Sequence, residues 1–477
     1  MKPQIDSIAH STDASMIEGK ASSVIYPKTA EEVKQIIIAG NNITIRGGGS
    51  GLVGGAVPNG IVVDLSKMNK ILNLDRQKKE VEVETGIILD ELNEYLEKYN
   101  LEFPVQPGSH SICTIGGMIA TNAVGNRAIK YGRTSNLVVA LEVVNGKGEI
   151  LKIGKAELAD FSGMEGITGV IVKAKLKLVE KKKRSATLFS FNEIEKVIDA
   201  VRKIKLVKDV SEIEFLDKFC SSLLGLEEKY HLIVELESEA GKLKNEEYEK
   251  IMIMRDSVYP VLAKLGYTHI EDPKILLHKF SELANFLEAE KIPFFGHLGV
   301  GIIHPVFRSE DRKKIKEMIK LVRKLHGQIT GEHGIGICKK EFLDNLEKKV
   351  IERVKLRCDP LCKLNYGKII DLGRKDVEEK VEQIRAEKKE QEKVEEIIEE
   401  VRRVEEAREQ VEDAEELVEE ARKEVDDEKE NVEEAKEEVE DEENKEQVEQ
   451  EKEYAERSEE SIEDIELADK QEQGEQK

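Results

Sequence analysis

The sequence lacks the features that mark membrane and secreted proteins. No segment reaches the roughly 18 consecutive apolar residues of a membrane-spanning helix, and the N-terminus has no apolar core of signal-peptide length. The five cysteines are scattered except for Cys358 and Cys362, which favours a reducing cytoplasm over a disulfide framework. That pair leaves two interpretations open, a metal or redox pair and two ordinary thiols. We therefore expect a cytoplasmic protein without a membrane span.

Several ligand-binding motifs are absent as well. The chain contains neither GxxxxGK(S/T) nor a good GxGxxG, so the P-loop and Rossmann rules do not apply. It has no CxxCxxC pattern for an iron–sulfur cluster, so electrons from a redox reaction would have to leave through another molecule. The one basic cluster is KKKR at 181–184, which argues against nucleic-acid binding.

Negative charge is concentrated at the C-terminal end of the 477 residues. Residues 374–477 hold 19 Lys and Arg against 46 Asp and Glu, whereas residues 1–373 hold 56 against 52. In the acidic part an apolar residue recurs at every seventh position, namely Ile397, Val404, Val411, Val418, Val425, Val432 and Val439. This pattern predicts a coiled coil that joins copies of the chain or docks a partner. A solvated, partly disordered acidic helix is the alternative.

The mildly basic body divides into two α+β regions. Within residues 1–183, short β-branched runs alternate with glycine-rich turns, and helical patterns cover 29–40 and 88–100. Within residues 184–373, strand patterns are followed by amphipathic helices at 244–265 and 309–326. We expect a nucleotide-binding domain at 1–183, a second domain at 184–373 and the acidic tail at 374–477.

Four of the nine histidines lie close together in the second region. Three of them are in the glycine-rich segments HLGVGIIH (297–304) and GEHGIG (331–336). Imidazole and carboxylate groups are typical ligands of transition metals, and glycine lets backbone approach a ligand closely. This spacing predicts a three-ligand metal site with a fourth residue free for proton transfer.

A glycine loop, RGGGSGL at 46–52, follows an apolar strand in the first region. Such a loop can expose consecutive N–H groups to a phosphate, although many glycine loops only turn the chain. Four further segments accompany it: HSTDASM (10–16), PKTAEEV (27–33), QPGSHSICTIGGMIATNAVGNRAIKYG (106–132) and EGITGVI (165–171). In this order, the five segments resemble the FAD-binding domain of the vanillyl-alcohol-oxidase/p-cresol-methylhydroxylase (PCMH) superfamily.

The second region resembles the substrate, or cap, domain of the D-lactate dehydrogenase and glycolate-oxidase subunit branch. The resemblance covers about residues 10–373 and implies a two-part PCMH-type FAD-binding domain followed by an α+β cap domain. It implies a non-covalent FAD, because the glycine loop has no histidine or cysteine to form a covalent link. The implied FAD-binding residues are Arg46, Gly47, Gly48, Gly49, Ser50, Gly51, Gly108, Gly116, Gly117, Asn122, Gly125, Glu165, Gly166, Gly169 and Ile171.

The same resemblance assigns the residues around the substrate. A divalent metal, Zn, Mn or Fe, would be held by His297, His304 and Glu332. The catalytic residues would be His333 as the base and Arg255 as the partner of the substrate carboxylate, with His269 as a second positive contact. The chain departs from the family pattern at Val300 and Ile302, where the motif HxGDGNxH has Asp and Asn, and at Asn365-Tyr366-Gly367, where the family has NPG.

These assignments imply oxidation of a D-2-hydroxy acid such as lactate or glycolate to its 2-oxo acid, with hydride passing to flavin N5. The electron acceptor is unknown, and an iron–sulfur or other partner subunit would place the protein peripherally at a membrane. Two alternatives stay open. One is a sugar-acid or aldonolactone-type FAD oxidase, favoured by Val300 and Ile302. The other is a non-catalytic flavoprotein scaffold that uses the coiled coil.

Overall fold

The protein is represented by a computed structural model that describes residues 7–372. The coiled coil expected in the acidic tail, and oligomerisation through it, lie outside these residues. The first sheet is parallel, with the strand order β1-β3-β2. Its strands are β1 (Lys20–Ile25), β3 (Asn59–Asp64) and β2 (Ile43–Arg46), and helix α2 (Ala30–Ala39) connects β1 to β2.

Helix α2 shows how the sequence sets these elements. The hydroxyl of Thr29 accepts a hydrogen bond from the backbone N–H of Glu32 and caps the first turn. Val33 and Ile37, four residues apart, are the buried positions of the helix and lie in one core with Ile43 and Val63. Strand β2, which leads into the glycine loop, is therefore anchored by its packing against α2.

A second, antiparallel sheet of five strands follows, with the order β4-β5-β9-β7-β8. Its elements are β4 (Ile71–Asp75), β5 (Glu80–Glu84), β9 (Gly169–Lys177), β7 (Val138–Asn145), β8 (Ile150–Ile153), α3 (Leu89–Glu97) and α4 (Ile115–Thr121). Three shorter elements complete this part, namely β6 (Leu101–Glu102), α5 (Ala128–Tyr131) and β10 (Val179–Glu180). Strand β5 buries Val81 and Val83, whereas Glu80 and Glu82, which alternate with them, are only partly buried.

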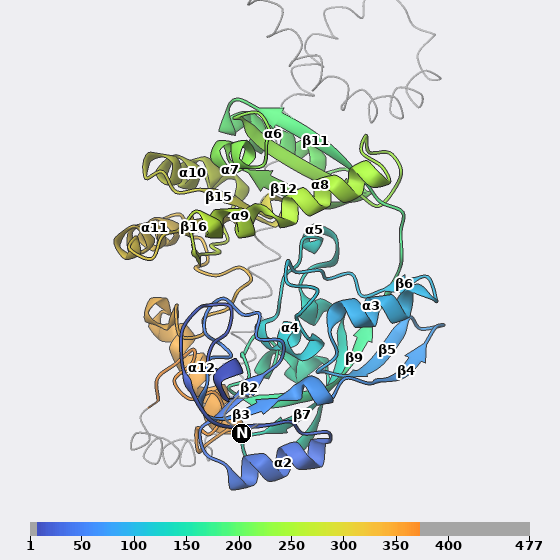
Figure 1. Cartoon of the computed structure of the whole chain (residues 1–477), viewed down its shortest axis with the longest axis vertical. Coiled ribbons are helices and arrows are strands. Elements are labelled where there is room, and N and C mark those ends of the chain that lie inside the picture. The colour runs from blue at the N-terminus through green and yellow to red at the C-terminus, as the bar shows by residue number, and fades with distance from the viewer. Residues whose placement is uncertain (1–6, 373–477) are drawn as a thin grey trace, which may run out of the picture. The chain divides into compact units, whose positions relative to one another are not determined.

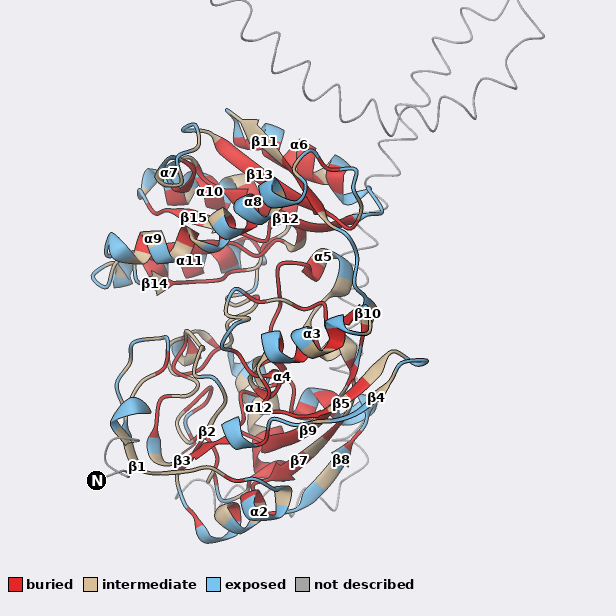
Figure 2. Ribbon diagram, turned by 45° about the vertical axis from the view of Figure 1, so that its right-hand side comes forward, coloured by how far each residue is buried: buried red, intermediate tan, exposed pale blue. Residues whose placement is uncertain are grey.

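The third sheet has six antiparallel strands in the order β11-β13-β12-β15-β16-β14. The strands are β11 (Ser185–Phe191), β13 (Tyr230–Leu236), β12 (Val210–Leu216), β15 (Phe294–Gly296), β16 (His304–Phe307) and β14 (His269–Ile270). The helices are α6 (Ile194–Lys205), α7 (Lys218–Leu223), α8 (Glu246–Asp256), α9 (Val258–Lys264), α10 (Phe280–Ala289) and α11 (Arg312–Lys324). Strands β12 and β13 are buried along their whole length (Figure 2).

The single helix expected at 244–265 is divided into α8 and α9 at Ser257. Pro260 explains the interruption, because it lacks the N–H that would bond to the carbonyl of Asp256 and continue the first helix. The division places Arg255 and Asp256 at the end of one helix and Tyr259 at the start of the next.

The last described segment returns to the first two sheets. Helix α12 (Asn345–Cys358) packs into the core of the five-stranded sheet, and Leu364 pairs with Ile43 of β2. In Figure 1 this orange segment lies among the blue and teal elements of the N-terminal half. Cys358 and Cys362 are buried in the same core, and neither forms a disulfide bond. The structure thus differs from the expected division, since residues 343–372 pack with the first region although they belong to the second in sequence.

Candidate active site

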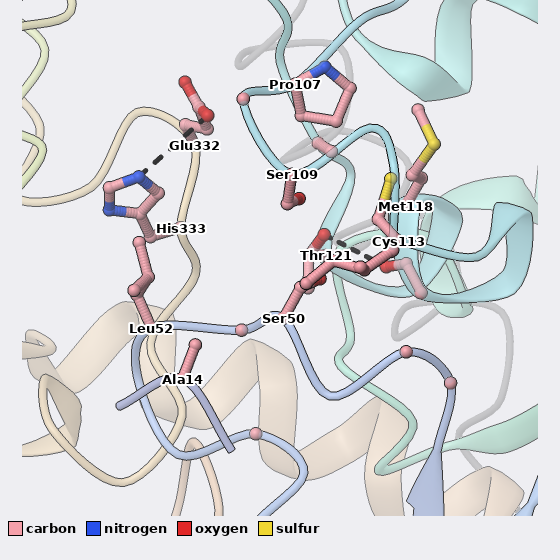
Figure 3. A pocket seen from close by; sticks show the side chains of 18 of the residues that line it. Ala14, Ser50, Leu52, Pro107, Ser109, Cys113, Met118, Thr121, Glu332 and His333 are labelled. Atoms are coloured by element: carbon pink, nitrogen blue, oxygen red, sulfur yellow. Dashed lines mark hydrogen bonds and ion pairs between the residues drawn. The ribbon is translucent and has the colours of Figure 1, made fainter. Parts of the chain in front are cut away.

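One cavity of about 500 Å³ joins the two regions of the described chain. From the first region it is lined by the glycine loop, by segment 107–123 and by the turn at 165–171. From the second region it is lined mainly by Arg255, Asp256, Tyr259, His297, His304, Glu332 and His333. Figure 3 shows Glu332 and His333 on one side of this pocket and Ser109, Cys113, Met118 and Thr121 on the other.

The glycine loop is packed tightly on the protein side and bare on the cavity side. A Cβ at Gly48 would lie 1.9 Å from the carbonyl oxygen of Ile112, and one at Gly47 would lie 2.3 Å from Oγ1 of Thr114. By contrast, a Cβ at Gly51 or Gly108, which also line the cavity, would meet no protein atom within 4 Å. These glycines therefore leave open a backbone-lined cradle, which fits the phosphates and ring system of FAD.

Most of the residues predicted to bind FAD line the cavity. They are Gly47, Gly48, Gly49, Ser50, Gly51, Gly108, Gly116, Gly117, Glu165, Gly166, Gly169 and Ile171. Arg46 lies outside the lining, and one of its terminal nitrogens donates to the carbonyl of Thr12 at 2.9 Å. Asn122 and Gly125 are also outside it, because Asn122 ends α4 in a left-handed conformation and Gly125 packs against the backbone of Gln106.

Glu165 connects the two halves of the site. Its buried carboxylate accepts hydrogen bonds from the backbone N–H groups of Ile335, at 2.6 Å, and Gly336, at 2.9 Å. Burial raises the pKa of Glu165 to about 7, although these two donors act in the opposite direction. The GEHGIG segment is thus held against the turn at 165–171.

The three predicted metal ligands meet in the structure. Ligand atoms of His297, His304 and Glu332 all lie within 4.8 Å of one another. Nε2 of His297 is 3.2 Å from Oε2 of Glu332, and Nε2 of His304 is 3.9 Å from the same oxygen. The two histidines come together because β15 and β16 are antiparallel neighbours, and Gly301 at φ +75 turns the chain between them.

The electrostatics of this cluster fit a bound cation. Burial lowers the pKa of His304 to about 4, so this ring is neutral and available as a ligand. Burial also disfavours a charged His297, but the carboxylates of Glu214 and Glu332 outweigh it and raise the pKa of His297. Oε2 of Glu332 and Nδ1 of His304 are buried without a hydrogen-bond partner. Two imidazoles and a carboxylate form a donor set suited to Zn, Mn or Fe.

Asp272 holds the turn that contains the predicted base. Its Oδ2 accepts hydrogen bonds from the backbone N–H groups of Gly331, Glu332 and His333, at 3.0, 2.7 and 2.7 Å. Its Oδ1 lies 3.7 Å from Nδ1 of His333 and is paired with the buried ammonium group of Lys339. This pairing keeps Asp272 ionised: burial alone would raise its pKa, but Lys339 and His333 hold the value well below its usual range.

Replacing Asp272 with alanine is expected to lower the free energy of unfolding by about 3–5 kcal/mol, because Lys339 would remain buried without one of its two carboxylate partners. Denaturant unfolding followed by circular dichroism measures this loss. The matched control is Arg312→Ala, which breaks an exposed ion pair with Glu341 and is expected to change stability by about 0–1 kcal/mol. Equal losses in the two variants would contradict the role given to Asp272.

The remaining predicted residues have different surroundings. Arg255 is buried at the end of α8 and lines the cavity, with its Nε 3.4 Å from Oε1 of Glu212. His269 is outside the lining and faces Glu271 at 2.9 Å. Val300 and Ile302 are also outside it, and the buried Ile302 packs against Val124 and Ala128. The departures from the family motif therefore lie in an apolar contact next to the site.

Comparison with known proteins identifies the chain. Residues 21–154 match the FAD binding domain family, and residues 226–369 match the family of FAD linked oxidases, C-terminal domain. The glycolate oxidase subunit GlcD of Bacillus subtilis is 30% identical over 436 residues, covering 76% of this chain and 92% of the relative. The chain belongs to the FAD-linked oxidase family. It is an FAD-dependent oxidoreductase that acts on a CH–OH group.

Other comparisons agree with this identification. The oxidase is 29% identical to D-lactate dehydrogenase of Archaeoglobus fulgidus over 404 residues, covering 73% of this chain and 91% of the relative. Its fold is similar to that of a solved alkyldihydroxyacetonephosphate synthase, with 18% identity and a TM-score of 0.57 over 76% of this chain and 81% of the other. Among residues 7–372, none of the helices combines the length and apolarity needed to cross a bilayer.

Three residues of the FAD-linked oxidase site were missed by sequence reasoning. Glu214 binds Nδ1 of His297, and Asp272 and Lys339 support the turn at His333. A signal was present for Glu214, because Glu212 and Glu214 are two residues apart in the apolar strand VSEIEFL, where buried carboxylates require partners. No local pattern distinguishes Asp272 or Lys339 from ordinary surface charges.

Proposed function

We propose that this oxidase converts a D-2-hydroxy acid of the lactate or glycolate type into the corresponding 2-oxo acid. The main support is that Arg255, His333 and the His297–His304–Glu332 cluster line the same cavity as the FAD-type glycine loop. The names of the two relatives, D-lactate dehydrogenase and glycolate oxidase subunit, add support for this substrate class.

Arg255 would bind the substrate carboxylate. Its guanidinium is buried in the cavity wall, and its Nε has no hydrogen-bond partner. A guanidinium presents parallel N–H groups that match the two oxygens of a carboxylate and fix its orientation. The α-carbon of the substrate would thereby be held in the cavity that His333 also lines.

His333 would take the proton of the substrate hydroxyl. Its ring is stacked on that of His304, with centroids 5.1 Å apart, and Asp272 and Glu332 face its two nitrogens at 3.7 and 3.9 Å. Bound FAD would supply the acceptor for the hydride that leaves C2. The proton and the hydride together are the two hydrogens removed when the alcohol becomes a carbonyl group.

His297, His304 and Glu332 would hold a divalent cation, and such a cation lowers the pKa of a hydroxyl that it binds. Glu214 would fix the orientation of His297 through the hydrogen bond at Nδ1. The electrons would pass from the oxidase to a separate acceptor, for which we propose an iron–sulfur or other protein subunit.

Glu214→Gln is expected to weaken metal binding about 10- to 100-fold, because the partner that orients His297 loses its charge. The measurement is metal content at defined free Zn²⁺ or Mn²⁺ concentrations. Glu195→Gln, an exposed substitution on α6, serves as the charge-matched control. Unchanged metal content in Glu214→Gln would remove Glu214 from the site.

Anaerobic bleaching of the flavin tests the proposed reaction. The FAD-loaded protein is mixed with D-lactate, L-lactate, glycolate and D-2-hydroxyglutarate, with and without a chelator. We expect chelator-sensitive bleaching by a D-hydroxy acid or glycolate and none by L-lactate. Bound FAD that none of these substrates reduces would favour sugar-acid or aldonolactone oxidation instead. A protein that cannot take up FAD would support the non-catalytic scaffold.

A further inference from the structure

The substrate end of the cavity offers one place for a carboxylate. Among the described residues that line the cavity, Arg255 is the single Lys or Arg. Three acidic residues, Glu214, Asp256 and Glu332, also line the wall, together with the histidines of the proposed metal site and the proposed base. Oδ1 of Asp256 lies 3.3 Å from a terminal nitrogen of Arg255, and the Asp256 side chain is 39% exposed, against 9% for Arg255.

The rest of this wall is largely apolar. Tyr259 and Pro260 come from α9, Ile270 from β14 and Phe295 from β15, and all four line the cavity. The hydroxyl of Tyr259 donates to the carbonyl of Thr268, which leaves the ring as its contribution to the wall. A short apolar substituent on the substrate is therefore matched by its surroundings.

On the basis of the proposed function, we infer that the cavity selects monocarboxylic 2-hydroxy acids with a small apolar substituent and rejects dicarboxylic ones. Asp256 is the specificity-determining residue. With Arg255 on the carboxylate next to the hydroxyl and the proposed cation of His297, His304 and Glu332 at that hydroxyl, a second carboxylate on the same small molecule would find no further Lys or Arg on the described wall. It would lie instead beside Asp256 and the apolar side chains of this wall.

The physical basis is the energy of an unpaired charge. A carboxylate moved from water into a partly apolar cavity loses hydration that only a cation or several N–H donors can replace. Like charges placed next to each other in such an interface disfavour binding strongly. Lactate and 2-hydroxybutyrate avoid both effects, whereas malate and 2-hydroxyglutarate meet both.

The test compares two substrate pairs on the FAD- and metal-loaded protein. Stopped-flow flavin reduction gives kcat/KM for D-lactate and D-2-hydroxybutyrate, and for D-malate and D-2-hydroxyglutarate. We expect the monocarboxylates to be favoured at least about 100-fold. Dissociation constants of pyruvate and 2-oxoglutarate, measured from the perturbed spectrum of the oxidised flavin, should differ in the same direction.

Substitution of Asp256 tests its role. Asp256→Asn is expected to raise the dicarboxylate-to-monocarboxylate ratio at least about 10-fold, and Asp256→Lys, which adds a cation, further still. Glu249→Gln is the matched control, because it removes one negative charge from the exposed first turn of α8. The dicarboxylate-to-monocarboxylate ratio of Glu249→Gln should equal that of the unmodified protein.

The outcomes separate this inference from the proposed function. If no hydroxy acid reduces the bound flavin, the proposed oxidation is wrong. If a dicarboxylate reduces the flavin as fast as D-lactate does, or faster, the oxidation stands and the selectivity is wrong. If Glu249→Gln shifts the ratio as much as Asp256→Asn, the discrimination comes from net charge and not from Asp256. The comparison of pyruvate with 2-oxoglutarate needs no variant, so it decides the selectivity even if an Asp256 variant fails to fold.

Discussion

Replacing His333 with alanine is expected to slow reduction of the bound flavin about 10²- to 10⁴-fold, which is the usual contribution of a general base. The physical reason is that the ring of His333 lies in the cavity wall between Asp272 and Glu332, where it can accept the proton of the substrate hydroxyl. FAD should remain bound, because the glycine loop lies on the other region of the chain. Single-turnover stopped-flow at saturating substrate measures the rate.

Two controls separate a missing base from a damaged site. His278→Ala changes an exposed histidine outside the cavity lining and should leave the rate unchanged. Added imidazole should restore part of the rate in His333→Ala, because a free base can enter the space left by the ring. An unchanged reduction rate in His333→Ala would remove this residue from the mechanism.

Gly51→Leu is expected to weaken FAD binding at least about 100-fold, equivalent to roughly 3 kcal/mol, while the protein stays folded. A Cβ at Gly51 meets no protein atom within 4 Å, so the new side chain would occupy the cavity itself. Flavin absorbance of the purified protein and fluorescence titration with added FAD measure the loss.

The matched control is Gly154→Leu, where a Cβ also meets no protein atom within 4 Å but the position lies outside the cavity lining. Both variants should unfold at nearly the same denaturant concentration as the unmodified protein. Full FAD occupancy in Gly51→Leu would show that the cofactor does not lie along this loop.

Local sequence patterns predicted much of the fold. The short β-branched runs expected within residues 1–183 include β1 and β3, and the expected helices at 29–40 and 88–100 correspond to α2 and α3. These patterns are readable because caps, β-branched runs and glycine turns act over a few residues. Strand β12 was missed, although it places Glu214 beside His297. The sheet buries its alternating glutamates, with Arg255 and His297 as their partners.

The sequence by itself indicated the glycine loop and the two histidines and glutamate that line the cavity. The glycines at 47–51, and two histidines and a glutamate in short motifs, are readable because backbone approach and metal binding demand those residue types. Only the tertiary structure decided how they are supported. Asp272 meets His333 across 61 positions, Glu214 meets His297 across 83, and Asn365 donates to the carbonyl of Glu165 across 200. Such contacts depend on which strands pair and which charges are buried together. Neither can be predicted from the residues next to them in the sequence.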